Sequence, residues 1–137
     1  MRSTMRSSVH FMLLVGGVGL AASLSSLHGN FVYRPPPSVG QPRALVHFLG
    51  GAFIGAAPQA GYSQLLRQFS EAGFVCLATP YETQFDYLDI CEKVLATAEP
   101  AVAQLRAEYG ELPLIGMGHS CGALLHVLIG SLFQGTK

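Results

Sequence analysis

Three short, mainly apolar segments, each followed by a segment with helical periodicity, constrain this chain most. They span residues 44–49, 74–78 and 112–116 and lack the polar alternation of a strand with one solvated face. Strands buried on both faces are typical of parallel sheets. Residues 30–34 predict an outer strand, ended by three prolines. Since alternating strands and helices with short connections give right-handed crossovers, the sequence predicts a doubly wound, mostly parallel α/β sheet with flanking helices.

The segments between these strands are predicted to be helices. One runs from about residue 59 to 72 and is ended by Gly73, and a longer one runs from about 86 to 109, where Pro100 should cause a kink or a division. Residues 123–129 predict a third, wholly apolar helix suited to burial. The apolar faces predicted for the first two helices are Tyr62, Leu65, Leu66, Phe69 and Ala72, and Leu88, Cys91, Leu95, Ala98, Val102, Leu105 and Tyr109.

The charge pattern argues against nucleic acid as a partner. The 137 residues are 50% hydrophobic, enough for one domain with a real core, and the formal net charge is zero. No acidic residue precedes Glu71, and the five arginines before it are scattered. A nucleic-acid surface needs clustered lysine and arginine, so we expect none here.

The cysteines do not predict a disulfide framework or a metal site. Cys76, Cys91 and Cys121 lie in apolar surroundings and show no C-x-x-C spacing. We interpret them as small hydrophobic residues of the core. We expect the chain to use neither a metal nor a cofactor.

The first 28 residues are interpreted as a targeting segment. Arg2 and Arg6 precede the apolar residues 11–22, which are too few to span a bilayer, and a serine-rich stretch follows with a cleavage point at Ala21-x-Ser23. Arginine and serine without acids suit an organelle transit peptide. A secretory signal and a retained anchor that contacts the membrane through 11–22 are the alternatives.

Residues 17–22 also fit G-x-G-x-x-A, the pattern of a dinucleotide-binding turn. That turn needs an acidic residue about 20 positions later to hold the ribose. None occurs before Glu71, which argues against nucleotide binding.

A G-x-S-x-G motif follows the third apolar strand and consists of Gly118, His119, Ser120, Cys121 and Gly122. A serine on a sharp strand-to-helix turn leaves no room for a Cβ two positions before or after it. Ligands of such sheets bind beyond the carboxyl ends of the strands. Residues 50–53, 79–84 and 118–122 are therefore expected to converge there.

These features resemble the first half of the α/β-hydrolase fold. Residues 46–53, 78–81, 118–120 and 128–131, in this order and spacing, are more narrowly similar to an uncharacterised hydrolase-like family of photosynthetic organisms, often located in plastids. The likeness runs from about residue 29 to 133. It implies that 29–137 form the N-terminal half of a hydrolase domain, truncated after the nucleophile helix.

The resemblance implies Ser120 as the nucleophile toward a small acyl ester or thioester. The Cys121 amide and an amide of the loop at Gly51 and Ala52 would form the oxyanion hole, and His119 would shape the elbow. Two preorganised amides stabilise the charge of an acyl-transfer intermediate, and losing one donor costs about 2.7–4 kcal/mol.

The acid and base of a catalytic triad are missing after the serine. Residues 121–137 contain no Asp or Glu, and His126 lies about 9 Å along the helix on a different face, so we interpret it as a core histidine. His47 within its strand is expected to be structural. The carboxylates near the sheet edge, interpreted as ordinary loop and helix-start groups, are Glu82, Asp86 and Asp89.

Two functions follow. The chain is either part of a serine hydrolase (an esterase, thioesterase or acyltransferase), inactive as this fragment, or a non-catalytic hydrolase-like binding protein. A hydroxyl without a general base is a poor nucleophile, so the distinction depends on a base outside these residues. The oligomeric state and the substrate are left open.

Overall fold

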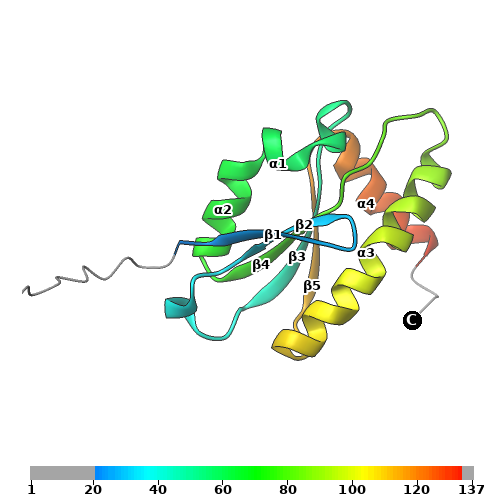
Figure 1. Cartoon of the computed structure of the whole chain (residues 1–137). Coiled ribbons are helices and arrows are strands. Elements are labelled where there is room, and N and C mark those ends of the chain that lie inside the picture. Colours follow the sequence, from blue (N-terminus) through cyan, green and yellow to red (C-terminus); the bar gives the residue numbers. More distant parts are fainter. Residues whose placement is uncertain (1–20, 134–137) are drawn as a thin grey trace, which may run out of the picture.

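A computed structural model describes residues 21–133 and contains a five-stranded sheet in the order β1-β2-β4-β3-β5 (Figure 1). The predicted apolar strands are β3 (Ala44–Leu49), β4 (Phe74–Ala78) and β5 (Leu114–Gly118), and they run parallel. The outer strand β2 (Asn30–Arg34) pairs antiparallel with β4 and with β1 (Ser23–Leu27). The predicted α/β sheet is confirmed, with an antiparallel hairpin at one edge.

Helices cover both faces of this sheet (Figure 1). The short helices η2 (Ile54–Ala56) and α1 (Pro58–Gly61) lead into α2 (Ser63–Glu71), which packs on one face. The long α3 (Tyr87–Tyr109) and α4 (Cys121–Leu132) pack on the other. A further short helix, η1 (Pro37–Val39), follows β2. Because the parallel strands all end at one edge, the loops that follow them meet there, as predicted.

The helix predicted over 59–72 is in fact divided at Tyr62, whose backbone (φ −123°, ψ 11°) leaves the helical region. Its predicted apolar face is right in part: Leu66 is buried and Tyr62 and Phe69 pack on the core, whereas Leu65 and Ala72 are exposed. Ser70, which was not predicted, is buried. The apolar stripe predicted on α3 is confirmed at Cys91, Ala98 and Leu105, but it is rotated slightly. Leu88 is exposed, and the buried residues that were not predicted are Ile90, Val94 and Ala101.

Pro100 does not divide α3, which runs unbroken past it. A proline in a helix interior removes the hydrogen bond to the carbonyl four residues earlier. Here Pro100 and Ala96 both lie on the exposed side of α3, where a backbone carbonyl can bond to water instead. The helix tolerates the proline for this reason.

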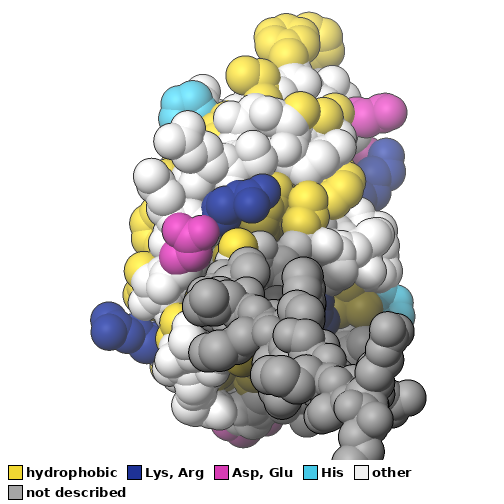
Figure 2. Space-filling view, turned by 60° about the vertical axis from the view of Figure 1, so that its left-hand side comes forward, with side chains coloured by type: hydrophobic (Ala, Val, Ile, Leu, Met, Phe, Trp, Pro, Cys, Tyr) yellow, Lys and Arg dark blue, Asp and Glu magenta, His cyan; other side chains and the backbone are white. Residues whose placement is uncertain are grey.

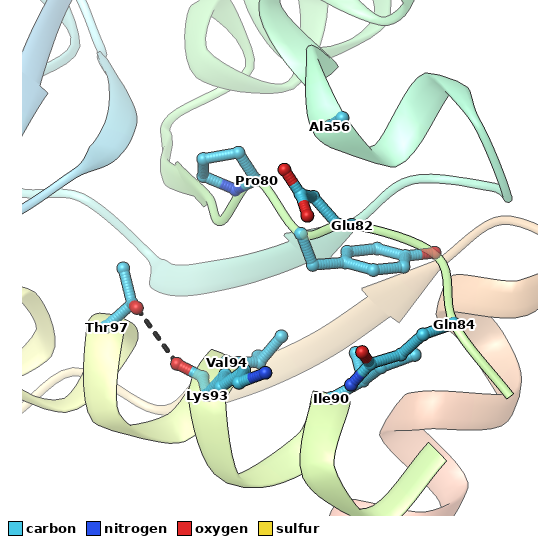
Figure 3. A pocket seen from close by; sticks show the side chains of 9 residues that line it. Ala56, Pro80, Glu82, Gln84, Ile90, Lys93, Val94 and Thr97 are labelled. Carbon is cyan, nitrogen blue, oxygen red and sulfur yellow. Dashed lines mark hydrogen bonds between the residues drawn. The ribbon is translucent and has the colours of Figure 1, made fainter. Parts of the chain in front are cut away.

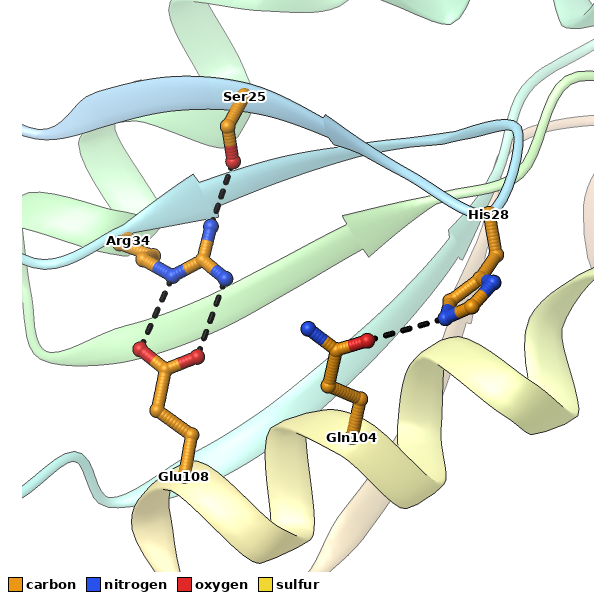
Figure 4. Close-up of polar contacts among 5 residues, drawn as sticks. All are labelled: Ser25, His28, Arg34, Gln104 and Glu108. Carbon is orange, nitrogen blue, oxygen red and sulfur yellow. Dashed lines mark hydrogen bonds and ion pairs between the residues drawn. The ribbon is translucent and has the colours of Figure 1, made fainter.

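A hairpin of β1 and β2 forms one edge of the sheet. Its turn is formed by His28 (φ 48°) and Gly29 (φ 79°), and two successive positive φ values characterise a tight two-residue hairpin. Arg34 donates to both carboxylate oxygens of Glu108 on α3 at 3.1 Å and to Ser25 Oγ, while His28 bonds Gln104 (Figure 4). The predicted boundary between residues 28 and 29 therefore falls within this turn, and residues 23–27 belong to the sheet.

Residues 1–20 lie outside the described residues. Most of the predicted targeting segment lies there, as does most of the G-x-G-x-x-A pattern and of the segment 11–22. These interpretations stay predictions. Within 21–133, no helix is long and apolar enough to cross a membrane.

The edge strand β5 and the neighbouring α4 leave apolar side chains uncovered. Leu114 and Ile115 of β5 are 47% and 46% exposed, and Val127 of α4 is 64% exposed. Only Gly122 and Leu125 of α4 are fully buried. The prediction of a buried helix was therefore wrong for much of α4, because no described element packs on its far side.

Candidate functional site

Ser120 occupies the turn between β5 and α4. Its φ of 54° and ψ of −117° lie in a region that residues with a side chain rarely adopt. The His119 amide donates to the Leu49 carbonyl at 3.1 Å, so pairing with β3 extends one residue beyond β5. The chain then enters α4 at Cys121. This strand, strained turn and helix are the geometry that exposes a serine hydroxyl at a sheet edge.

The two glycines that flank this turn leave no space for side chains. A Cβ on Gly118 would overlap the backbone of Gly122 and Ala123. A Cβ on Gly122 would overlap the carbonyl groups of Leu49 and Gly50. The spacing of the motif therefore follows from the close contact of α4 with the end of β3.

The loop after β3 lies directly beside Ser120. The position of a Cβ on Gly51 would be 3.5 Å from Ser120 Cβ, 3.1 Å from His119 Nδ1 and 3.3 Å from the Tyr62 hydroxyl. These three side chains thus surround the Gly51 backbone. The structure brings together the loop and the turn that the sequence had placed at the same edge.

Most amides of this loop are already occupied. The Gly51 amide donates to the Tyr62 hydroxyl at 2.8 Å, Phe53 to Thr83 Oγ1, Ile54 to the Ala52 carbonyl and Gly55 to the Gly51 carbonyl. Within residues 51–55, the Ala52 amide alone makes no hydrogen bond in the structure as described.

On the other side of the turn, Gly122 donates to the His119 carbonyl, and Ala123 and Leu124 donate to that of Ser120. The Cys121 amide makes no hydrogen bond to any described residue. The amides of Ala52 and Cys121, on either side of Ser120, are therefore both uncommitted. Of the two loop positions predicted from sequence, Ala52 keeps its amide available and Gly51 does not.

Tyr62 was not identified as a site residue from sequence, where it belonged to the apolar face of a helix. Its hydroxyl accepts from Gly51 and lies 2.9 Å from His119 Nδ1. A tyrosine at a helix break near a Gly-Gly loop is a weak signal. The sequence does not reveal that the loop folds back onto this helix.

His47 and Thr79 belong to a buried polar chain behind the site. The Thr79 hydroxyl donates to Asn30 Oδ1 at 2.6 Å and lies 2.8 Å from His47 Nε2. Because the one hydroxyl proton goes to Asn30, His47 Nε2 is the donor to Thr79. Burial, and secondarily the nearby His126, lower the pKa of His47 to about 3. His47 is therefore neutral and structural.

The other titratable candidates are also engaged elsewhere. His126 packs edge-on against His47 at 5.1 Å between ring centroids, and burial lowers its pKa. Asp86 caps α3 by accepting from the Leu88 and Asp89 amides, and Asp89 pairs with Lys93. Among residues 21–133, no imidazole or carboxylate forms a hydrogen bond with Ser120 Oγ. The described residues contain a candidate nucleophile without a base.

Two of the cysteines are buried as expected, and all three are free. Burial raises the pKa of the Cys76 thiol to about 12, which leaves it unreactive at neutral pH.

A cavity of about 360 Å³ opens between η2, the loop after β4 and α3 (Figure 3). Glu82 and Gln84 line it from the loop, and Lys93 and Thr97 from α3. Tyr81 also lines this cavity, and its hydroxyl donates to the Gly50 carbonyl at 2.5 Å. Burial and a hydrogen bond with Cys121 raise the pKa of Tyr81. The Tyr81 side chain thus connects this cavity with the backbone around the turn.

A family model described as a protein of unknown function, DUF1350, matches residues 24–137. The chain belongs to this family. No relative among curated proteins matches the chain. The match begins inside β1, which agrees with a DUF1350 domain that includes the N-terminal hairpin.

One similar solved structure is a highly thermostable carboxyl esterase from Bacillus coagulans, crystallised with glycerol. The TM-score is 0.59 at 19% identity, and the match covers 85% of this chain and 42% of the esterase chain. At this identity the likeness establishes the fold alone. This DUF1350 chain therefore has a hydrolase-like α/β fold and spans less than half the length of that esterase chain.

Proposed function

We propose that this chain contributes the nucleophile and the oxyanion hole of a serine hydrolase or acyltransferase that acts on a small ester or thioester. Ser120 attacks the acyl carbon, and the Ala52 and Cys121 amides receive the developing oxyanion. The observation that carries the proposal is the pair of unbonded amides on either side of a strained, exposed serine. Preorganised amides need no rearrangement when charge develops, which is the source of their catalytic effect.

The general base would come from polypeptide outside the described residues. His47 is buried and neutral, His126 packs against it, and His119 is hydrogen-bonded to Tyr62. The carboxyl esterase that shares the fold is a chain of which this one covers 42%. We infer that this chain by itself performs acyl transfer slowly.

Exposed apolar side chains near the same edge favour a substrate with an apolar group. Phe53 is 88% exposed beside Ala52, and Phe85 in the loop before α3 is fully exposed. Figure 2 shows hydrophobic side chains gathered at the top of the molecule, where the parallel strands end. Such side chains bind an acyl chain or an aromatic alcohol by removing its apolar surface from water.

A fluorophosphonate probe with added imidazole tests this proposal. The Ser120 oxygen would bond to phosphorus as fluoride leaves, and imidazole would take the hydroxyl proton in place of the missing base. We expect mass spectrometry to find the adduct on Ser120, at a rate that rises with imidazole concentration. Ser120→Ala should abolish it. Absence of an adduct on Ser120 at high imidazole would contradict the proposal.

A second candidate function is a non-catalytic, hydrolase-like binding protein. Two observations favour it. Ser120 Oγ makes no hydrogen bond to another described side chain, and β5 and α4 expose an apolar face to which a partner could bind. An unreactive Ser120 in the imidazole experiment would favour this alternative.

We also propose that the N-terminal residues direct the protein to plastids. The support is the arginine- and serine-rich, acid-free start of the chain. A fusion of residues 1–22 to a fluorescent protein should accumulate in chloroplasts of a plant cell. Accumulation in the secretory pathway would support the alternative signal.

A further inference from the structure

We propose that Tyr62 is a positioning residue of this site: its hydroxyl holds the Gly51 amide and the His119 imidazole, which leaves the Ala52 and Cys121 amides to face the reacting oxygen. This inference rests on the proposed function for its catalytic consequence. The hydrogen-bond arrangement itself can be tested without any reaction.

The hydrogen bonds of the Tyr62 hydroxyl define its role. The oxygen accepts from the Gly51 amide at 2.8 Å, and the His119 Nδ1 atom lies 2.9 Å away. A phenol has one proton to donate, and a neutral imidazole accepts at the nitrogen that carries no hydrogen. In the proposed arrangement Tyr62 donates its proton to Nδ1, so that the neutral His119 ring carries its own proton on Nε2.

The Tyr62 ring is held against the end of β3. It packs edge-on against Phe48 with 4.8 Å between ring centroids. The position of a Cβ on Gly50 would lie 2.7 Å from Tyr62 Cε2, so the ring occupies the space of a side chain at that residue. Both glycines of the loop thus serve Tyr62, because Gly50 admits its ring and Gly51 admits its hydroxyl.

The position of Tyr62 in the chain makes this contact possible. Tyr62 lies between α1 and α2, where its non-helical backbone separates the two helices. Its amide and carbonyl remain bonded to Pro58 and Leu66, at 2.9 and 3.0 Å, so the break is well ordered on both sides. A continuous helix would give the side chain at residue 62 a different direction.

The hydrogen bond between Tyr62 and Gly51 decides which amide of the loop remains available to an oxyanion. Successive amides of a turning loop point in different directions, and Gly51 and Ala52 are neighbours. With Gly51 bonded to Tyr62, and with Phe53, Ile54 and Gly55 bonded to other partners, Ala52 is the residue within 51–55 whose amide is left for an oxyanion. Loss of the Tyr62 hydroxyl would release Gly51 and let the loop adopt other arrangements.

Tyr62→Phe tests the inference, with Tyr87→Phe as the matched control. Tyr87 is 41% exposed on α3, and its hydroxyl has no hydrogen-bond partner in the structure as described. We expect Tyr62→Phe to speed hydrogen exchange of the Gly51 amide about tenfold or more and to shift the His119 Nδ1 nitrogen resonance. Tyr87→Phe should change neither.

Acyl transfer supplies the second readout. The rate at which Ser120 reacts with a fluorophosphonate in imidazole should fall by up to about 100-fold in Tyr62→Phe, the loss typical of a small misplacement of reacting groups. Thermal unfolding checks that both variants fold. An unchanged Gly51 exchange rate and His119 resonance would overturn the inference, as would an unchanged labelling rate at Ser120.

The two proposals fail in different ways. If wild-type Ser120 never reacts while Tyr62→Phe still alters Gly51 and His119, the proposed function is contradicted and the hydrogen-bond arrangement is supported. If Ser120 reacts equally in both proteins, the proposed function is supported and Tyr62 has a structural role alone.

Discussion

His47 Nε2 donates a 2.8 Å hydrogen bond to Thr79 Oγ1, and this pair joins strand β3 to the residue that directly follows β4. Asn30 of the hairpin completes the chain by accepting from Thr79. An imidazolium could also donate from Nε2, so it is the burial of the ring, and not this hydrogen bond, that keeps His47 neutral. The stability of the fold is therefore linked to pH through this residue.

We predict that the free energy of unfolding decreases as the pH falls from about 6.5 toward 3. The ordinary pKa of a histidine is 6.5, and burial lowers the pKa of His47 to about 3 in the fold, so the unfolded chain binds the proton first over this range. Stability must then fall with decreasing pH, at up to about 1.4 kcal/mol per pH unit from this residue. Urea unfolding from pH 4 to 7 measures the slope.

His47→Gln is the matched variant for this measurement, since an amide can still donate to Thr79 but does not titrate. It should show a shallower slope than the wild type. If the free energy of unfolding depended on pH equally in both proteins, other groups would cause the dependence. One such group is Glu108, whose pKa Arg34 lowers.

Ser120→Gly is expected to stabilise the chain. The φ of 54° and ψ of −117° at Ser120 cost of order 1–3 kcal/mol for a residue with a Cβ, and glycine adopts this conformation freely. We expect a gain of about 1 kcal/mol in thermal unfolding, with loss of any reaction at this position. Ser120→Ala, which keeps the Cβ, should have nearly the stability of the wild type. A Ser120→Gly variant no more stable than Ser120→Ala would show that the turn is not strained.

Truncation tests where the folded domain begins. A chain that starts at Ala22 should unfold at the temperature of the full chain, because it keeps β1. A chain that starts at Gly29 loses this strand, the contact of Leu27 with the core and the bond from Arg34 to Ser25, and we expect a loss of about 2 kcal/mol or more. Equal stability of the two chains in differential scanning calorimetry would place the boundary after β1.

The exposed edge strand predicts self-association. Leu114 and Ile115 on β5, together with Val127 on α4, present apolar surface next to the open backbone of an edge strand. Such edges pair with other chains, and a lysine on them opposes the pairing. We expect analytical ultracentrifugation to show concentration-dependent association that Ile115→Lys reduces without a change in secondary structure. A wild-type chain that stays monomeric at high concentration would contradict this expectation.

The three parallel strands were predictable because each is a short apolar run bounded by a turn, a pattern that survives in any context. Glycine spacing around Ser120 was predictable for a similar reason, since the steric limits of the turn are local. The sequence did not predict which residues of α3 are buried or that much of α4 is exposed. Both depend on which elements pack beside these helices in the folded sheet.

By itself, the sequence determined the order of strands and helices and the edge at which the loops after β3, β4 and β5 meet. It also determined the position of Ser120 on a sharp turn that requires glycine at residues 118 and 122. Only the tertiary structure decided that Tyr62 occupies the Gly51 amide and leaves that of Ala52 uncommitted. It also decided that β1 belongs to the sheet. Hydrogen bonds between residues distant in sequence depend on how the loop folds back on the helix, and no local pattern encodes that path.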